Sequence, residues 1–313
     1  MEQNAGFSTP ISVRLLGDFQ IIRADGVVLR SPDLGGCKTR LILEILLLQL
    51  GTPVSKDRLI ELLWGGHAPD GAVATVESYV SGLRRTIQPG HTRTGPLRTS
   101  NGGYVLDSAL VDLDLARFHR LIRRADRCQN AEAYRLLLQS LEIGSSPLLS
   151  HELTSEWAES ERTSQAATVQ EIQVRVSELA TILGKTGEAI RWAQTAVTAD
   201  CLNERAWTAL VTAFEGASLY TEGLSAYERC RRLFGRELGC VPGPSLRAAH
   251  LRLLRQTAEE ESELAEVLNA LLYLGARLNL VSGIGFSGGG RDLSSEGAGQ
   301  ILDSFLRRAR TAT

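Results

Sequence analysis

The segment from residue 75 to residue 87 carries apolar side chains along one side of a potential helix. Their spacing is i, i+3, i+4, i+7 and i+11, the pattern of an α-helix with one buried face; the residues are Val76, Tyr79, Val80, Leu83 and Ile87. Between residues 78 and 106 the chain has four arginines and no acidic residue, and it passes through Asn101-Gly102-Gly103. A helix followed by a basic hairpin with a glycine tip predicts a winged helix-turn-helix.

The residues before this helix complete a small domain. Hydrophobic alternation around two turn signals predicts short strands, and Ser55 is a suitable N-cap for a helix that precedes the one described above. The expected order βββ-α-α-α-ββ assigns residues 1–110 to a winged helix-turn-helix DNA-binding domain. The predicted elements are the strands within residues 12–30, the helices Lys38–Leu50 and Lys56–Leu63, and the wing strands Leu97–Thr99 and Tyr104–Leu106.

After residue 110 the sequence predicts a succession of helices, and it contains an internal repeat. Residues 187–190 align with residues 221–224 at a spacing of 34 residues, which is the tetratricopeptide period. Residues 111–258 are therefore predicted to form a tetratricopeptide-like helical domain, and the fold class is mainly α with a small amount of β. The same offset pairs Ala193 with Tyr227, Val176 with Leu210 and Ala180 with Phe214, and it pairs Val197 poorly with Arg231. The flanking helices are expected at Leu113–Arg127, Ala131–Ile143 and Leu246–Thr257.

Net charge, cysteine content and the length of apolar runs indicate which partners and which cellular compartment to expect. The formal net charge is -2, and residues 1–110 carry 11 Lys/Arg against 10 Asp/Glu, so any nucleic-acid binding must come from a local patch. The five cysteines form no CxxC pair, which favours buried free thiols in a reducing cytosol. No apolar run reaches membrane-spanning length, and the N-terminus has no secretory signal pattern. We expect a cytoplasmic, nucleoid-associated protein without a membrane partner.

No residue pattern predicts catalysis, a cofactor or a metal site. The histidines lack HExxH or comparable ligand spacing, and no Ser/His/Asp arrangement stands out. The Gly-rich run at residues 283–290 lacks the Lys-Ser/Thr of a phosphate-binding loop. We therefore interpret residues 259–313 as a tail with a Gly-rich linker, and we do not expect an enzyme.

The side of the 75–87 helix opposite its apolar residues predicts the DNA contacts. Hydroxyl side chains there can bond base edges or phosphates, and arginines can grip phosphates. Cations at the start of the preceding helix suit phosphates, and wing residues suit the minor groove. The alternative interpretation is an ordinary amphipathic core helix. The predicted DNA-binding residues are Lys56, Arg58, Thr75, Ser78, Ser81, Arg84, Arg85, Arg98 and Asn101.

Residues 12–257 resemble the Streptomyces antibiotic regulatory protein (SARP) family, whose members join a response-regulator-type winged helix to a bacterial transcriptional activation domain. The motifs that carry the resemblance are Leu16-Gly17-Asp18-Phe19, Gly36-Cys37-Lys38-Thr39-Arg40, residues 54–60 with Leu63-Trp64-Gly65, residues 79–85, Gly103-Tyr104, residues 114–118, and residues 237–244 before Leu246 and His250. The chain departs from the family pattern at Cys37, Thr39, Cys201 and Ser145-Ser146-Pro147-Leu148. No nucleotide-binding ATPase domain follows, so the resemblance is to a small family member.

The resemblance implies a transcriptional activator that binds direct repeats in promoter DNA as a homodimer. It also implies recruitment of RNA polymerase holoenzyme, through the sigma factor and other subunits, to genes of secondary-metabolite biosynthesis. The loop from residue 65 to residue 71 is expected to face the polymerase through His67 and Asp70. Two alternatives stay open: a ligand-responsive regulator or repressor, and a tetratricopeptide-like interaction scaffold without specific DNA binding.

Overall fold

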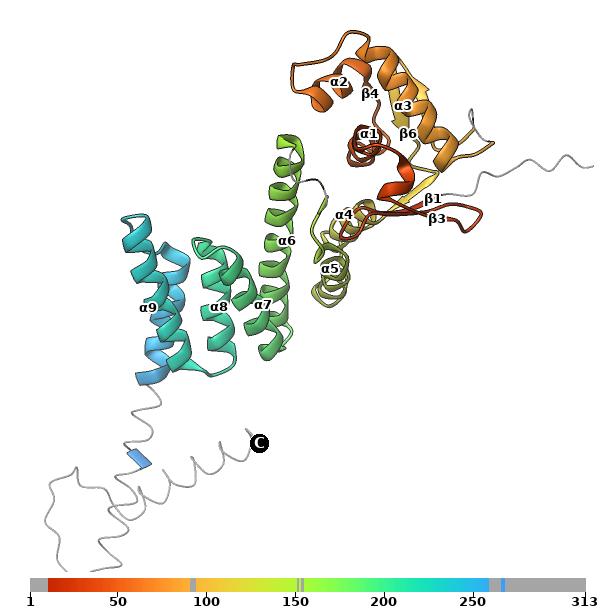
Figure 1. Cartoon of the computed structure of the whole chain (residues 1–313). Helices are drawn as coiled ribbons and strands as arrows, with labels where there is room; N and C mark the ends of the chain where they lie inside the picture. The colour runs from red at the N-terminus through yellow and green to blue at the C-terminus, as the bar shows by residue number, and fades with distance from the viewer. Residues whose placement is uncertain (1–10, 91–93, 151, 153–154, 259–265, 268–313) are drawn as a thin grey trace, which may run out of the picture. The chain divides into compact units, whose positions relative to one another are not determined.

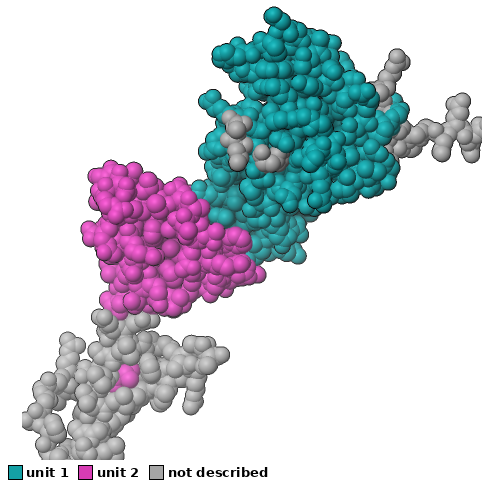
Figure 2. Space-filling view, in the orientation of Figure 1, with its two compact units in different colours: residues 1–183 teal, residues 184–313 magenta. Residues whose placement is uncertain are grey.

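The computed structural model describes residues 11–90, 94–150, 152, 155–258 and 266–267. The chain divides into two compact units, residues 1–183 and 184–313, coloured separately in Figure 2. Each unit is described by itself. Arg93 lies outside the described residues, as does almost all of the tail predicted for residues 259–313. The domain boundaries predicted at residues 110 and 258 stay predictions.

The first unit begins with a four-stranded sheet of order β3-β2-β1-β7, of which β1 and β3 are labelled in Figure 1. Its strands are β1 (Ile11–Arg14), β2 (Gln20–Ile22), β3 (Val28–Arg30) and β7 (Val111–Leu113). Strands β1, β2 and β3 pair antiparallel, whereas β7 lies parallel to β1. Alternate residues of each strand are buried, so the sheet has one core face and one solvent face. The sequence predicted the first three strands and missed β7.

Three helices and a second sheet form the rest of the winged helix. The elements are the 3-10 turn η1 (Ser31–Leu34), helices α1 (Cys37–Leu48), α2 (Lys56–Trp64) and α3 (Ala72–Ile87), and strands β4 (Val54–Ser55), β5 (Leu97–Ser100) and β6 (Gly103–Leu106). Helix α1 is buried almost throughout, including Glu44, whose carboxylate lies 3.3 Å from the Arg40 guanidinium. The second sheet has the order β4-β6-β5. The predicted winged helix-turn-helix is confirmed, although the short strand β4 was not anticipated.

The described residues of the first unit contain three further helices: α4 (Asp114–Ala125), α5 (Asn130–Gly144) and α6 (Glu156–Ile182). Helix α5 packs against both α4 and α6. The α4–α5 contact is close at Gly144, where an added Cβ would lie 2.5 Å from Cε2 of Phe118. The first two helices confirm the sequence-based expectation to within a few residues.

The second unit contains α7 (Thr186–Ala199), α8 (Glu204–Gly216), α9 (Tyr220–Glu237) and a helix over residues 244–258. Adjacent helices pack in chain order, and Gly223 of α9 lies so close to Leu253 that an added Cβ would be 2.7 Å from Cδ1. The 34-residue repeat is visible in burial, because the members of its well-matched pairs are buried alike. These are Val176 with Leu210, Ala180 with Phe214, Ala189 with Gly223 and Ala193 with Tyr227. The poorly matched Arg231 is exposed, as a tetratricopeptide-like stack allows.

The prediction that the cysteines are buried is wrong for most of them. Cys37, Cys201 and Cys240 are exposed and Cys128 is partly exposed, whereas Cys230 is buried. The exposed cysteines lie at a helix start or in the connections near α8 and α9, where the backbone leaves the core. The sequence gives the number of cysteines, but their spacing does not show which thiols face solvent.

In the folded chain, iodoacetamide at mildly alkaline pH is expected to modify Cys37, Cys201 and Cys240 and to spare Cys230. The thiolate is the reactive form, and burial raises the pKa of the Cys230 thiol to about 12. Mass spectrometry of digested protein measures each site. Urea should make Cys230 reactive, and its rapid labelling without urea would contradict the packing of α9.

Candidate nucleic-acid interface

Helix α3 presents a buried face and a polar face, as its sequence predicts. Val76, Val80, Leu83 and Ile87 are buried, and Tyr79 is half-buried. On the other side Ser78, Ser81 and Arg85 are exposed, and Thr75 is half-exposed with its hydroxyl donating to the Gly71 carbonyl at 3.2 Å. The polar face thus holds hydroxyl and guanidinium groups that can reach base edges and phosphates.

Arg84 and Arg85 are neighbours with different environments. Arg84 donates from Nε to the Leu97 carbonyl at 3.2 Å and from Nη2 to Thr99 Oγ1 at 2.8 Å, and its guanidinium lies 5.7 Å from the Tyr104 ring centroid. Arg84 therefore ties α3 to the wing. Thr99 accepts one of these hydrogen bonds, but it was not predicted as a functional residue, because nothing in the sequence distinguishes a threonine hydroxyl on a strand.

Arg85 projects from the exposed side of α3. Among the described residues it has no hydrogen-bond or ion-pair partner. It lines a hollow of about 290 Å³ with Ser78 and Gly82 of its own helix and with Asp33 and Thr39 near the start of α1. A guanidinium in this position is free to meet a phosphate.

The predicted cations of α2 are paired with acidic side chains. Lys56 Nζ lies 2.5 Å from Oε1 of Glu77 on α3, and this hydrogen bond raises the pKa of Lys56. Arg58 Nη1 lies 2.6 Å from Oε2 of Glu61, while its backbone N–H donates to the Ser55 hydroxyl that caps α2. In DNA binding, phosphates would have to compete with these carboxylates.

The wing places Asn101 and Arg98 on its surface. Asn101 has φ of 34° and stands before Gly102, with φ of 77°, in the turn between β5 and β6. Arg98 Nη1 is bound to Asp107 Oδ2 at 2.8 Å, with 44% of the Arg98 side chain exposed. The tip is exposed, as a minor-groove contact requires, whereas Arg98 is anchored at the base of the hairpin.

The loop between α2 and α3 exposes His67 and Asp70. Lys38 fixes the start of this loop, because its ammonium donates to the Leu63 carbonyl at 2.6 Å and lies 4.6 Å from the Trp64 ring centroid. Lys38 belongs to a motif that carries the family resemblance, but its role could not be read from the sequence, since the contact joins residues 25 positions apart.

Two findings bear on membrane and metal binding. Within the described part of the chain, no helix combines the length and the apolar character needed to cross a membrane. The same residues contain no group of three or more His, Cys, Asp or Glu side chains arranged to hold a metal ion.

Comparisons with known proteins match both regions of the chain. The family described as "Transcriptional regulatory protein, C terminal" matches residues 36–106, and the bacterial transcriptional activator domain matches residues 113–254. The transcriptional regulatory protein EmbR of Mycobacterium tuberculosis is 29% identical over 249 residues, which cover 77% of this chain and 63% of EmbR. The chain thus spans less than two thirds of that relative's length.

Streptomyces relatives and one solved structure agree with these matches. The regulatory protein AfsR of Streptomyces coelicolor is 30% identical over 76% of this chain and 24% of its own length. The regulatory protein DnrI of Streptomyces peucetius is 28% identical over 70% of this chain and 84% of its own length. The structure of Mycobacterium tuberculosis EmbR with a low-affinity phosphopeptide superimposes with a TM-score of 0.68 at 26% identity, covering 85% of this chain and 71% of that one. With its two domains in this order and these relatives, the chain has the domain architecture of the Streptomyces antibiotic regulatory protein family of transcriptional regulators.

Proposed function

We propose that this regulator is a sequence-specific activator that binds direct repeats in promoter DNA as a homodimer and recruits RNA polymerase holoenzyme. The observation that carries the proposal is the exposed polar face of α3, which carries Ser78, Ser81 and Arg85, an arginine with no side-chain partner among the described residues. Thr75, Arg84 and the wing tip at Asn101 are proposed to extend this surface. Lys56, Arg58 and Arg98 are proposed to contact phosphates that displace their acidic partners Glu77, Glu61 and Asp107. The genes it controls are proposed to belong to secondary-metabolite biosynthesis, as in the family that it resembles.

Recruitment requires only modest contact energy. Each ~1.4 kcal/mol of added protein contact raises polymerase occupancy about tenfold when occupancy is low. The exposed loop with His67 and Asp70 is the proposed polymerase-facing surface of the winged helix. Sigma factor and other holoenzyme subunits are the proposed partners.

Arg85→Ala is expected to weaken binding to a promoter fragment about tenfold and to lower the salt slope by about 1, because one phosphate contact is lost. The fragment is first selected from genomic DNA and then titrated at several salt concentrations. Arg127→Ala is the matched control, since Arg127 is an exposed arginine outside the winged helix with no side-chain partner among the described residues. Arg84→Ala should also lower the unfolding temperature, because Arg84 holds the wing.

The proposal fails if no fragment is enriched over random DNA and Arg85→Ala binds like the control. That result would favour the tetratricopeptide-like scaffold. Enrichment of a direct repeat, followed by transcription in vitro from the selected fragment, separates activation from repression.

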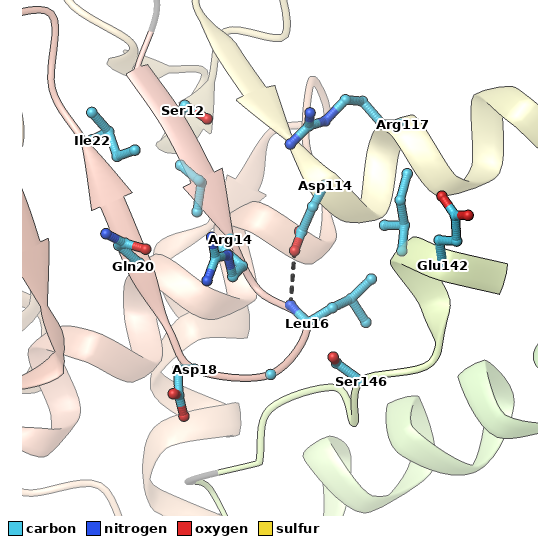
Figure 3. A pocket seen from close by; sticks show the side chains of 13 residues that line it. Ser12, Arg14, Leu16, Asp18, Gln20, Ile22, Asp114, Arg117, Glu142 and Ser146 are labelled. Carbon is cyan, nitrogen blue, oxygen red and sulfur yellow. Dashed lines mark hydrogen bonds between the residues drawn. The ribbon is translucent and has the colours of Figure 1, made fainter. Parts of the chain in front are cut away.

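A cavity in the first unit supports a second candidate, a ligand-responsive regulator. The cavity has a volume of about 550 Å³ and lies between β1, β2 and the α4–α5 pair (Figure 3). Arg14, Gln20 and Glu142 line it, and the Asp114 carboxylate at its wall accepts from the Leu16 N–H at 3.0 Å. A rise in unfolding temperature with a pathway metabolite, lost in Arg14→Ala, would favour this candidate; no shift with any metabolite of the regulated pathway would remove it.

A further inference from the structure

Helix α9 carries three arginines on one side, next to a hollow in the second unit. Arg229, Arg232 and Arg236, together with Leu233, lie at i, i+3, i+7 and i+4, so all four share one helix face. They line a hollow of about 430 Å³ with Trp207 of α8. The hollow lies within the second unit, away from the winged helix in sequence, and the proposed function does not use it.

Trp207 and Leu233 give this hollow an apolar floor. Trp207 is only 5% exposed, and its indole N–H is already bonded to the Cys201 carbonyl at 2.9 Å, which fixes the ring. The Arg229 guanidinium lies 5.6 Å from that ring's centroid, within the range of a cation–π contact. The arginine stems extend the apolar surface, and their charged ends surround it.

The charges around the hollow are largely uncompensated. Among the described residues no carboxylate pairs with Arg229 or Arg232, and the Arg232 Nε donates only to the Glu228 carbonyl at 3.3 Å. Arg236 contacts Glu237 at 2.7 Å, but 74% of the Arg236 side chain is exposed. Neighbouring Arg231, by contrast, is paired with Glu228 at 2.9 Å. Two adjacent guanidinium groups are therefore available to bind an anion.

We infer that this surface, Trp207 with Arg229, Arg232, Leu233 and Arg236, docks an acidic peptide segment of a partner protein. Glutamate or aspartate side chains one helical turn apart would meet the arginines, which are spaced by one turn, in charge-assisted hydrogen bonds. An apolar side chain between those acids would fill the hollow above Trp207 and Leu233. A nucleic-acid backbone matches the charges but has no apolar side chain for the floor, so the combination favours a peptide.

Fluorescence anisotropy with the chain of residues 1–313 tests this inference. The probe is a short, labelled helical peptide whose glutamates at i, i+3 and i+7 flank one leucine, and its sibling carries glutamine in place of every glutamate. Arg229→Glu/Arg232→Glu is expected to weaken probe binding more than about tenfold, as removal of central charged contacts does at interfaces. Leu233→Ala should weaken it several-fold without changing the charge, and the glutamine sibling should not bind.

Arg247→Glu/Arg255→Glu is the matched control. It makes the same change in net charge on the neighbouring helix over residues 244–258, at exposed arginines outside the hollow. Circular dichroism checks that each variant is folded, and Arg229→Gln/Arg232→Gln replaces the charge reversal if that variant is not. Equal losses in the two double variants would overturn the inference.

Random-sequence duplex DNA is the remaining comparison. If Arg229→Glu/Arg232→Glu lowers DNA binding and leaves the peptide unaffected, the surface contacts nucleic acid and the inference is wrong. The peptide assay contains no DNA, so its failure and the failure of promoter binding are independent results.

Discussion

Asp114→Ala is expected to lower the free energy of unfolding of the first unit by about 4 kcal/mol. Asp114 is 5% exposed, and its carboxylate accepts hydrogen bonds from the Leu15 and Leu16 backbone N–H groups at 3.0 Å. It also accepts from the Leu115 N–H at 2.7 Å, at the first turn of α4. Removal would leave the buried N–H groups of Leu15 and Leu16, which directly follow β1, without an acceptor, and buried unpaired donors are costly.

Urea unfolding followed by circular dichroism measures this loss. Asp114→Asn keeps one acceptor oxygen, so its free energy of unfolding should lie between those of the wild type and Asp114→Ala. Asp112→Ala is the control, because Asp112 is an exposed acid two residues away whose ion pair with Arg117 spans 3.4 Å, and such a pair contributes less than about 1 kcal/mol. If Asp114→Ala and Asp112→Ala unfold alike, Asp114 does not join the sheet to α4.

Strand β7, which directly precedes Asp114, could not be predicted from the sequence. Strand β7 pairs with β1 in the register Ile11 with Val111, a separation of 100 residues. A strand of three residues has too few positions for hydrophobic alternation to show, so only the tertiary pairing identifies it. The boundary expected at residue 110 therefore falls one residue before a strand that completes the N-terminal sheet.

Long amphipathic helices, unlike the short strand β7, could be predicted from the sequence. Helix α3 spans four turns, and its apolar positions repeat often enough to reveal which side is buried. The 34-residue repeat is visible for the same reason, because two copies place small or apolar residues at matching positions. Side-chain pairing carries no such period: the Lys56–Glu77 pair and the Arg84–Thr99 bond depend on how α2, α3 and the wing are brought together.

Gly103→Ala is expected to lower the free energy of unfolding by about 3 kcal/mol and to weaken promoter binding, because it forces β6 away from β4. An added Cβ would overlap sterically with the Val54 carbonyl oxygen and would lie 2.7 Å from the Val54 carbonyl carbon and 2.8 Å from the Ser55 Cα. All three are backbone atoms, so no side-chain rotation relieves the overlap. Gly103 pairs with Ser55 in the sheet, immediately before α2 begins at Lys56.

Gly102→Ala separates this overlap from backbone strain. Gly102 has φ of 77°, and nothing lies within 4 Å of an added Cβ there, so the same substitution should cost only about 1 kcal/mol of conformational strain. Urea unfolding and DNA titration of both variants give the comparison. If Gly102→Ala and Gly103→Ala lower the free energy of unfolding equally, the close approach of β4 and β6 is not what requires a glycine at residue 103. If Gly103→Ala keeps its helical content yet loses promoter binding, while Gly102→Ala keeps both, the wing is required for DNA binding by a fold whose helices form without it.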